Sequence, residues 1–301
     1  MSTPRWVSPL RYPGGKVRMT PWLVEVFDHL FGFMDVEVWI EPFGGGAGAA
    51  LMALETHDVP EAWIVETNPA LAAFWTTIMA DEGRLAARVE KTTPTVALFE
   101  QARETVAASL AGDTTVDRED LGYAAFILNR CSRSGMVLGN VGPIGGKHQT
   151  GTHTVGSRFH GERLAERLRA VSAFGGRFRA FEGDGITYTD HLEGSGIEDE
   201  VFLFVDPPYI GEGNRLYTRG MQPTCHARLA AALERCPAPW VLTYDAHPDV
   251  LELYPQHEVV EFDIPHTANR QKVGTEYLVL PEGLSVPEVH PLGKGQWWAV
   301  A

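Results

Sequence analysis

A catalytic role is best supported for the tetrapeptide Asp206-Pro207-Pro208-Tyr209. It directly follows residues 201–205, an unbroken apolar run that is typical of a strand buried on both faces of a parallel sheet. Ligands of open α/β sheets bind beyond the carboxyl ends of the strands, and the tetrapeptide falls at such an end. Two consecutive prolines leave the backbone few accessible conformations, so the turn is stiff.

The groups in this turn suit transfer to an aromatic amine. The lone pair of such an amine is delocalised into the ring and attacks poorly. The Asp206 carboxylate and a proline carbonyl, each accepting one amine hydrogen, favour the pyramidal, reactive amine and stabilise the positive charge that develops during attack on a sulfonium methyl. Tyr209 offers an aromatic face on which a base can stack. An ordinary proline-rich turn after a strand is the alternative.

A glycine-rich turn, Glu41-Pro-Phe-Gly-Gly-Gly-Ala-Gly48, is the second candidate site. It lies between an expected strand (36–40) and an expected helix (49–55), where glycines let a ligand approach the backbone closely. The run is not G-x-G-x-x-G, and no Lys-Ser/Thr follows it, so neither a dinucleotide fingerprint nor a phosphate loop is present. The turn suits a cofactor with a cationic sulfonium and a carboxylate, or a tight connection without a ligand.

Three charged residues stand where they can contact such a cofactor. Glu66 ends the expected strand 62–65, about 20 residues after the glycine turn, where an acid accepts hydrogen bonds from ribose hydroxyls. Asp184 follows the expected strand 177–181 and either contacts the adenine half of a cofactor or caps a turn. Lys16 opens a helix and is expected to reach a cofactor carboxylate, unless it lies in an exposed N-terminal turn.

The elements that must position these residues alternate along the chain, which indicates an open, doubly wound α/β sheet. The expected strands are 36–40, 62–65, 177–181, 201–205, 240–244 and 276–280. The expected helical segments are 17–31, 49–55, most of 70–130 and 161–171. Residues 132–160 are rich in Gly, Ser, Thr and His and are expected to be mostly loop. The stretch from about 80 to 175 therefore predicts an inserted, mostly helical domain.

The charge distribution bears on a nucleic-acid partner. The chain has 301 residues with a net charge of −14, which by itself argues against DNA or RNA. However, residues 130–180 hold nine Lys or Arg and two Glu, a net of +7, and residues 1–18 hold four basic residues and no acid. A phosphate backbone responds to the local potential, so this basic segment predicts a nucleic-acid contact, with a chance cluster as the alternative.

Other features narrow the class of protein. The chain is 44% hydrophobic, which argues against disorder, and it has no apolar run of the roughly 20 residues that a membrane span needs. Its start lacks the apolar run of a signal peptide. The three cysteines show no C-x-x-C spacing, so neither a disulfide framework nor a zinc site is indicated. We expect a cytoplasmic protein, bacterial or in a phage-infected host, without metal and without a membrane partner.

Together the motifs resemble the Dam-like DNA adenine-N6 methyltransferases and follow that family's order. The resemblance extends from about residue 11 to about residue 280 and rests on Tyr12-Pro-Gly-Gly-Lys16, Glu41-Pro-Phe43 with its glycines, Glu66-Thr-Asn68, Asn129-Arg130 and Asp206-Pro-Pro-Tyr209. Many family members have Trp where Tyr12 stands and Asp where Glu66 stands, and their glycine run is commonly one residue shorter. These departures preserve the chemistry but blur the residue assignments.

The resemblance implies a site-specific enzyme that transfers a methyl group from S-adenosyl-L-methionine to the exocyclic amine of adenine in double-stranded DNA, after flipping the base. It implies a Rossmann-like catalytic domain at 1–79 and 176–301 and an inserted target-recognition region at 80–175. The implied catalytic residues are Asp206, Pro207, Pro208 and Tyr209. The implied cofactor residues are Tyr12, Gly14, Lys16, Glu41, Phe43, Gly45, Gly46, Glu66, Asn68 and Asp184. The implied DNA-binding residues are Asn129, Arg130, Arg133 and Lys147.

Two other kinds of function stay open. The methyl acceptor can be RNA, the cytosine amine or a glutamine side chain, although related motifs for glutamine and many RNA acceptors begin with Asn, and those for cytosine often with Ser. A catalytically silent DNA-binding relative is the other alternative, and the intact motif from Asp206 to Tyr209 counts against it. A dehydrogenase is disfavoured because the dinucleotide fingerprint is absent.

Overall fold

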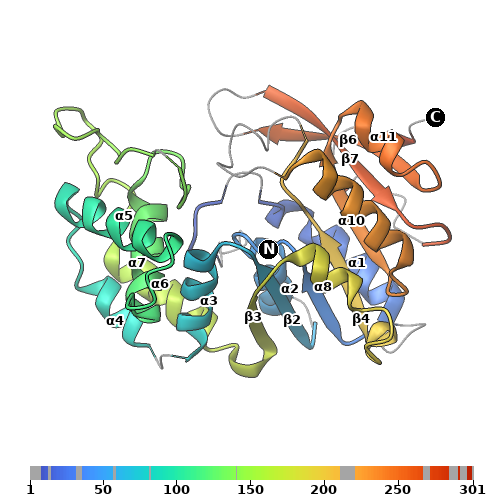
Figure 1. Ribbon diagram of the computed structural model, residues 1–301, viewed down its shortest axis with the longest axis horizontal. Coiled ribbons are helices and arrows are strands. Elements are labelled where there is room, and N and C mark those ends of the chain that lie inside the picture. Colours follow the sequence, from blue (N-terminus) through green and yellow to red (C-terminus); the bar gives the residue numbers. More distant parts are fainter. Residues whose placement is uncertain are drawn as a thin grey trace.

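A mixed β-sheet runs through the centre of the protein, with helices on both faces (Figure 1). The computed structural model describes residues 8–12, 15–31, 36–56, 59–80, 83–139, 141–210, 221–266, 272–284, 291 and 297–299. The strands are β1 (Val38–Glu41), β2 (Glu61–Glu66), β3 (Phe178–Glu182), β4 (Val201–Val205), β5 (Trp240–Asp245), β6 (Glu258–His266), β7 (Lys272–Leu280) and β8 (Trp297–Ala299). Within the described residues they form one eight-stranded sheet in the order β3-β2-β1-β4-β5-β7-β6-β8.

The first five strands of the sheet are parallel, and β7 joins β5 in antiparallel orientation. The strand order reverses between β1 and β4, so the chain leaves these two neighbouring strands toward opposite faces of the sheet. Ligands of doubly wound sheets bind at the carboxyl ends of the strands beside such a reversal. The loops after β1 and β4 are the glycine-rich turn and the Asp206–Tyr209 tetrapeptide, which the topology therefore brings to one edge.

Helices surround the sheet and form a separate group at one side of it. They are α1 (Thr20–Phe31), α2 (Gly48–Thr56), α3 (Pro69–Ala80), α4 (Arg84–Glu90), α5 (Val96–Leu110), α6 (Arg118–Cys131), α7 (Gly161–Ser172), α8 (Gly185–Asp190), α10 (Pro223–Arg235) and α11 (Pro248–Leu253). Short 3-10 turns span Val17–Met19, Gly175–Arg177 and Glu198–Glu200. The predicted α/β doubly wound, Rossmann-like sheet is thus confirmed, whereas the helix at 223–235 and the strand at 258–266 were not expected.

Alternating side chains divide the strands between two hydrophobic cores. Trp39 and Phe202 point into the core beneath α1, α2 and α3, where their rings meet edge to face at 5.3 Å between centroids. Ile40 and Leu203 point into the core beneath α8, α10 and α11. Since every residue of β4 is buried, its sequence shows no polar alternation, as the apolar run 201–205 predicts.

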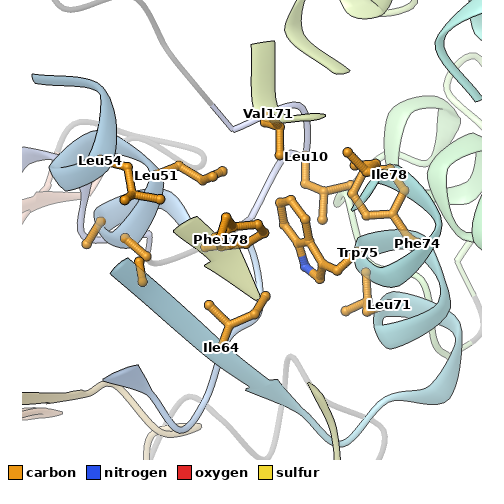
Figure 2. Packing of buried hydrophobic residues seen from close by; sticks show 14 of the residues in the cluster. Leu10, Leu51, Leu54, Ile64, Leu71, Phe74, Trp75, Ile78, Val171 and Phe178 are labelled. Atoms are coloured by element: carbon orange, nitrogen blue, oxygen red, sulfur yellow. The ribbon is translucent and has the colours of Figure 1, made fainter. Parts of the chain in front are cut away.

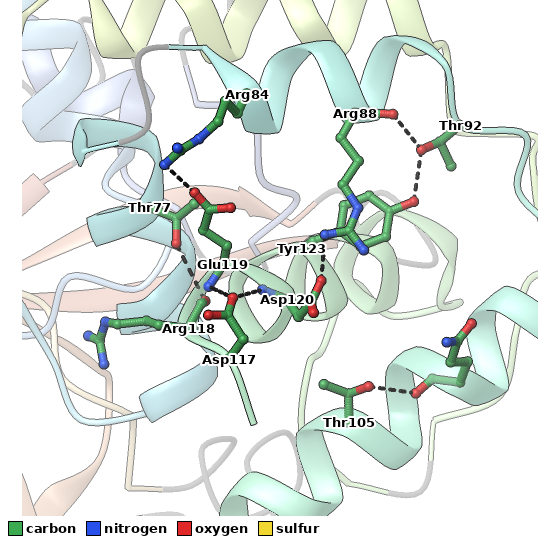
Figure 3. A network of polar contacts seen from close by, with 11 residues as sticks. Thr77, Arg84, Arg88, Thr92, Thr105, Asp117, Arg118, Glu119, Asp120 and Tyr123 are labelled. Carbon is green, nitrogen blue, oxygen red and sulfur yellow. Dashed lines mark hydrogen bonds and ion pairs between the residues drawn. The ribbon is translucent and has the colours of Figure 1, made fainter. Parts of the chain in front are cut away.

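Helices α4 to α7, here called the helical lobe, lie together beside α3 (Figure 1). Polar contacts join α4 to α6: Arg88 donates a hydrogen bond to Asp120 at 2.6 Å, and its guanidinium carbon lies 3.7 Å from the centroid of the Tyr123 ring (Figure 3). Thr92 and the Tyr123 hydroxyl are 2.8 Å apart. Asp117 caps α6 by accepting two backbone N–H groups. The loop-rich segment 132–160 connects α6 to α7 with no helix among its described residues, as expected.

The third helix joins the helical lobe to the sheet (Figure 2). Trp75 is fully buried, 5.7 Å from the ring of Phe178 in β3, and Phe74 stacks on Phe126 of α6 at 5.4 Å. The Trp75 indole also donates a hydrogen bond of 2.9 Å to the carbonyl of Gly45. One helix therefore fixes both the position of the lobe and the conformation of the glycine-rich turn.

Two classes of feature are absent from the part of the chain that the structure describes. No helix there is long and apolar enough to cross a bilayer. No group of three or more His, Cys, Asp or Glu side chains is arranged there to hold a metal ion.

Replacing Trp75 with Phe tests its role in this arrangement. Trp75→Phe removes the hydrogen bond to Gly45 and leaves a small void, so we expect the free energy of unfolding to fall by about 1–3 kcal/mol. Urea denaturation measures the change. The matched control is Trp63→Phe, whose indole bonds to the half-buried Glu61, and there we expect less than about 1 kcal/mol. Equal losses for the two variants would contradict the assignment.

Candidate active site

An ion pair between Lys16 and Asp206 lies at the carboxyl end of β4. The Lys16 ammonium is 3.0 Å from Oδ1 and 3.2 Å from Oδ2 of Asp206. Lys16 is only 4% exposed, whereas the Asp206 side chain is 24% exposed. Lys16 was expected to reach a cofactor carboxylate, and that expectation stays a prediction; in this structure its ammonium lies against the predicted catalytic acid. The buried lysine compensates the charge of Asp206 while that carboxylate stays open to solvent.

Strand β5 fixes the tetrapeptide at both ends. The Thr243 hydroxyl donates a 2.7 Å hydrogen bond to Oδ1 of Asp206, and the Ile210 N–H donates a 3.0 Å hydrogen bond to Asp245. Among the described residues, Oδ1 of Asp206 therefore receives two donors, while Oδ2 receives the lysine alone. Since a carboxylate oxygen has about two acceptor positions, Oδ2 is the oxygen that can still bind an amine hydrogen.

Glu276 of β7 completes the polar cluster behind the tetrapeptide. It is 2% exposed, and its Oε2 lies 3.6 Å from the Lys16 ammonium. Burial raises the pKa of Glu276 to about 7, and the nearby ammonium opposes this rise. Lys16 is thus held between two carboxylates.

Tyr209 ends the tetrapeptide with its ring packed against the core. The Lys16 ammonium lies 4.9 Å from the ring centroid, and the Tyr244 ring is 6.2 Å away. The buried Tyr209 hydroxyl has no hydrogen-bond partner among the described residues, and burial raises the pKa of Tyr209 well above its usual value. Pro207 is buried and Pro208 is half-buried, so the tetrapeptide is anchored on its inner side.

The glycine-rich turn is closed by an aromatic ring. A Cβ on Gly45 would lie 2.6 Å from the Tyr12 ring, and a Cβ on Gly46 would lie 2.6 Å from the Cβ of Tyr12. Gly45 also has a φ of +45°, and the Ser8 hydroxyl donates to the Gly46 carbonyl at 2.6 Å. Only glycine leaves room for Tyr12 at these positions. The predicted contact at Gly14 lies outside the described residues.

Glu66 lies at the end of β2, as predicted, and supports the same turn. It is 7% exposed, and its carboxylate accepts hydrogen bonds from the backbone N–H groups of Gly45 at 2.9 Å and Asn68 at 2.8 Å. Burial raises the pKa of Glu66 to about 7 despite these bonds. Asn68 in turn caps α3 by accepting from the N–H of Ala70 at 3.0 Å. Glu66 therefore connects the two strand-end turns.

Glu41 and Phe43 flank the start of the glycine turn. The Glu41 carboxylate is 5% exposed and accepts from the Ala50 N–H at 2.6 Å and the Trp39 indole at 3.3 Å. Burial, which outweighs these hydrogen bonds, raises the pKa of Glu41 to about 8. Phe43 is half-buried against the core beneath α8 and α10.

Asp184 caps α8, which is one of the two roles expected for it. Its side chain accepts from the Ile186 N–H at 3.3 Å and from the Thr187 hydroxyl at 2.8 Å. The next residue, Gly185, packs so closely on the Pro42 carbonyl that a Cβ there would lie 1.9 Å from the oxygen. This contact places the turn after β3 directly beside the turn after β1.

Asn129 connects the helical lobe to the N-terminal strap, which we define as residues 8–12. Asn129 is fully buried; its Oδ1 accepts from the Arg11 N–H at 2.8 Å, and its Nδ2 donates to the carbonyls of Arg11 at 2.8 Å and Gly135 at 2.7 Å. These bonds use the amide inside the protein, so Asn129 holds Arg11 and Gly135 in position.

Arg130 belongs to a cluster of arginines at the same junction. It donates to the carbonyls of Arg158 at 2.7 Å and Pro9 at 3.5 Å. Burial, with smaller contributions from Arg11 and Arg167, lowers the pKa of Arg130 to about 10. Several arginines therefore lie near one another at this junction.

Arg133 and Lys147 lie on the surface of the loop-rich segment 132–160. Both side chains are exposed, and the Arg133 N–H donates to the Gly142 carbonyl at 3.3 Å. Of the four residues predicted to bind DNA, these two present their side chains to solvent.

The structure thus brings together two groups of predicted residues. Asp206 to Tyr209 join Lys16 behind β4, and Tyr12, the glycines and Glu66 join at the ends of β1 and β2. Thr243, Asp245 and Glu276 contact the first group but were not predicted. Each lies in or at the end of an expected strand, and a polar residue in such an apolar run is the signal that could have identified them.

Replacing Glu41 with Gln tests the burial of charge at this edge. The pKa of Glu41 is about 8, above its usual 4.5, so its stabilising contribution is present below the usual value and is lost as pH rises through about 8. Gln keeps the acceptor oxygen without the charge. We expect the parent to lose on the order of 4 kcal/mol more stability than Glu41→Gln between about pH 5 and 8.5, measured by calorimetry. The exposed Glu37→Gln should keep the parent slope.

Comparison with known proteins agrees with the motifs. Residues 12–112 match the D12 class N6 adenine-specific DNA methyltransferases. No curated protein matches the chain. Two solved structures of the rRNA methyltransferase aviRa from Streptomyces viridochromogenes align with 91% of this chain and 88% of theirs, at 16% identity and TM-scores of 0.35 and 0.36. The family match includes Tyr12, Lys16 and Glu66 and confirms the resemblance that the motifs indicated. The similarity to the D12 class N6 adenine-specific DNA methyltransferases is therefore shown for residues 12–112 of the 301-residue chain.

Proposed function

We propose that the protein transfers a methyl group from S-adenosyl-L-methionine to N6 of adenine in double-stranded DNA, with Asp206 to Tyr209 as the catalytic residues. One observation carries this assignment: the Asp206 carboxylate is held by Lys16 and Thr243 at the carboxyl end of β4 and keeps one oxygen available. A fixed, partly solvent-accessible acceptor is what activation of an aromatic amine requires.

The residues around the glycine turn fit the cofactor by their chemistry. Glu66 accepts backbone hydrogen bonds from Gly45, Thr67 and Asn68, and its two oxygens together offer about four acceptor positions, so one can take a ribose hydroxyl. The contact between Gly185 and Pro42 brings Asp184 to the same edge, where its carboxylate can face the adenine half. When bound, S-adenosyl-L-methionine supplies an electrophilic methyl group on a sulfonium.

The residues of this chain then act on the adenine amine. Oδ2 of Asp206 accepts one amine hydrogen and a proline carbonyl accepts the other, which frees the nitrogen lone pair. Both groups stabilise the positive charge that develops on the nitrogen during the transfer. Lys16 and Thr243 hold the carboxylate so that little reorganisation accompanies the reaction.

The adenine must leave the duplex to reach this edge of the sheet, because its amine lies inside the helix. Base flipping has a cost of a few kcal/mol in lost pairing and stacking. The Tyr209 ring would recover part of this cost by stacking on the base. The Lys16 ammonium lies 4.9 Å from the centroid of this ring, so a base stacked on Tyr209 would lie near Lys16.

Residues 80–175 are assigned to target recognition, and residues 1–79 and 176–301 to catalysis. The arrangement of α4 to α7 beside α3 supports this division. The arginine cluster around Arg130 supports a phosphate-binding role for the junction, with Arg133 and Lys147 as exposed contacts. Asn129 supports this surface from within rather than through its own amide.

Replacing Asp206 tests the catalytic assignment. Asp206→Ala removes an interaction that matters most in the transition state, so we expect turnover to fall at least about 100-fold while cofactor and DNA affinity stay within a few fold. Transfer of labelled methyl to adenine-containing duplex DNA measures turnover, and calorimetry measures cofactor binding. Asp249→Ala, a change at an exposed acid on α11, is the matched control and should behave as the parent. Near-parent turnover by Asp206→Ala would show that another acid acts.

Replacing the exposed cations tests the DNA surface. Arg133→Ala and Lys147→Ala should each weaken DNA binding across sequences and lower the salt slope by about one unit for each phosphate that the parent side chain neutralises. Cofactor affinity should not change. Lys91→Ala, at the exposed end of α4, serves as the control and should leave DNA binding as it is. A fall in cofactor affinity with unaltered DNA affinity would place this segment elsewhere.

A further inference from the structure

A second carboxylate contacts the cation that holds the catalytic acid. Glu276 lies on β7 directly opposite Asp245 of β5, the strand that also carries Thr243. It is 2% exposed, and its Oε2 lies 3.6 Å from the Lys16 ammonium. Burying a carboxylate is unfavourable unless it is paired, and Lys16 is the charged partner that the geometry provides.

The ammonium of Lys16 connects the two acids. Lysine has three N–H donors, and Lys16 directs its charge to both oxygens of Asp206, at 3.0 and 3.2 Å, and to Glu276 at 3.6 Å. A lysine side chain has several rotatable bonds, so pairing with a single carboxylate would leave the position of its ammonium only partly fixed. Contact with two carboxylates, Asp206 in the turn after β4 and Glu276 on β7, fixes the ammonium between them.

The charge of Glu276 also changes how strongly Lys16 neutralises Asp206. An ionised Glu276 compensates part of the positive charge of Lys16 and adds a second negative charge near Asp206. The carboxylate of Asp206 then becomes a stronger hydrogen-bond acceptor. A protonated Glu276 leaves the ammonium to Asp206 alone and weakens that acceptor.

Several charged or titratable groups face Glu276 and influence its charge. Lys16 and Asp206 face it from the N-terminal segment and from the end of β4, and Tyr209 approaches from the tetrapeptide. Glu276 pairs with Asp245 of β5 on one side and with the apolar Phe262 of β6 on the other. Burial raises the pKa of Glu276 to about 7, which places its change of charge near neutral pH.

We propose that Glu276 is a positioning residue for methyl transfer, which holds the Lys16 ammonium in place against the Asp206 carboxylate. The inference rests on the catalytic role proposed for Asp206. Glu276 touches neither the amine nor the cofactor in this scheme and acts through Lys16.

Glu276→Gln tests the proposal because it keeps the shape and removes the charge. We expect kcat to fall about 10- to 100-fold, as a small misplacement of a catalytic group does, while KM for DNA and cofactor stays within about threefold. In the parent, kcat should rise as pH increases through about 7, since Glu276 ionises there. Glu276→Gln should lack this rise.

Glu261→Gln is the matched control. Glu261 lies on β6 and pairs with Tyr277, the residue next to Glu276, so the same chemical change is made one strand away on the other face. It should keep both the parent kcat and the parent pH profile. If Glu276→Gln also keeps both, the proposal is wrong.

Two further variants make the outcomes distinguishable. If Glu276→Gln does not fold, Glu276→Asp keeps the charge at shorter reach: it should lower kcat and retain the rise with pH, and a parent kcat would overturn the proposal. Asp206→Ala is assayed in parallel. An inactive Asp206→Ala with a parent-like Glu276→Gln refutes only the inference on Glu276, whereas an active Asp206→Ala refutes the proposed function.

Discussion

Acidic residues converge at the carboxyl edge of the sheet, and the arrangement of the site depends on how their charges are accommodated. Of four neighbouring parallel strands, three end in Glu66, Glu41 and Asp245, and the fourth, β4, is directly followed by Asp206. Two of these acids are buried, and burial raises the pKa of Glu41 to about 8 and that of Glu66 to about 7. Asp206 is compensated differently, by the ammonium of Lys16. The N-terminal segment folds over this edge and supplies the lysine that pairs with Asp206.

The backbone of the glycine-rich turn also determines how the N-terminal segment packs on this edge of the sheet. The Tyr12 side chain occupies the space that a side chain at position 45 or 46 would need, so both positions require glycine. The Trp75 indole holds the carbonyl of Gly45 by a hydrogen bond. The N-terminal segment thus packs its aromatic ring on the glycine turn and its cation on Asp206. Two separate motifs in the sequence are parts of one packing arrangement.

Much of this site was predictable because strand ends and turns are local features. The apolar run 201–205 and the turn after it were placed correctly, since a fully buried strand needs no long-range information. The pair of Lys16 and Asp206 was not predictable, because 190 residues separate its members and only the strand order brings them together. Similarly, Asn129 and Arg133 are four residues apart, yet one is buried and the other exposed, because α6 ends between them.

The N-terminal strap has a thermodynamic consequence. Within it, the backbone of Arg11 is hydrogen-bonded to Asn129 near the end of α6, and the neighbouring Tyr12 packs on the glycine turn. A ligand that shifts or displaces Arg11 therefore alters the same few peptide units that shape the other site. Free energies of binding at two sites that share a structural element are coupled reciprocally. The strap would thus couple the two surfaces proposed to bind DNA and cofactor, the arginine cluster around Arg130 and the glycine turn, equally in both directions.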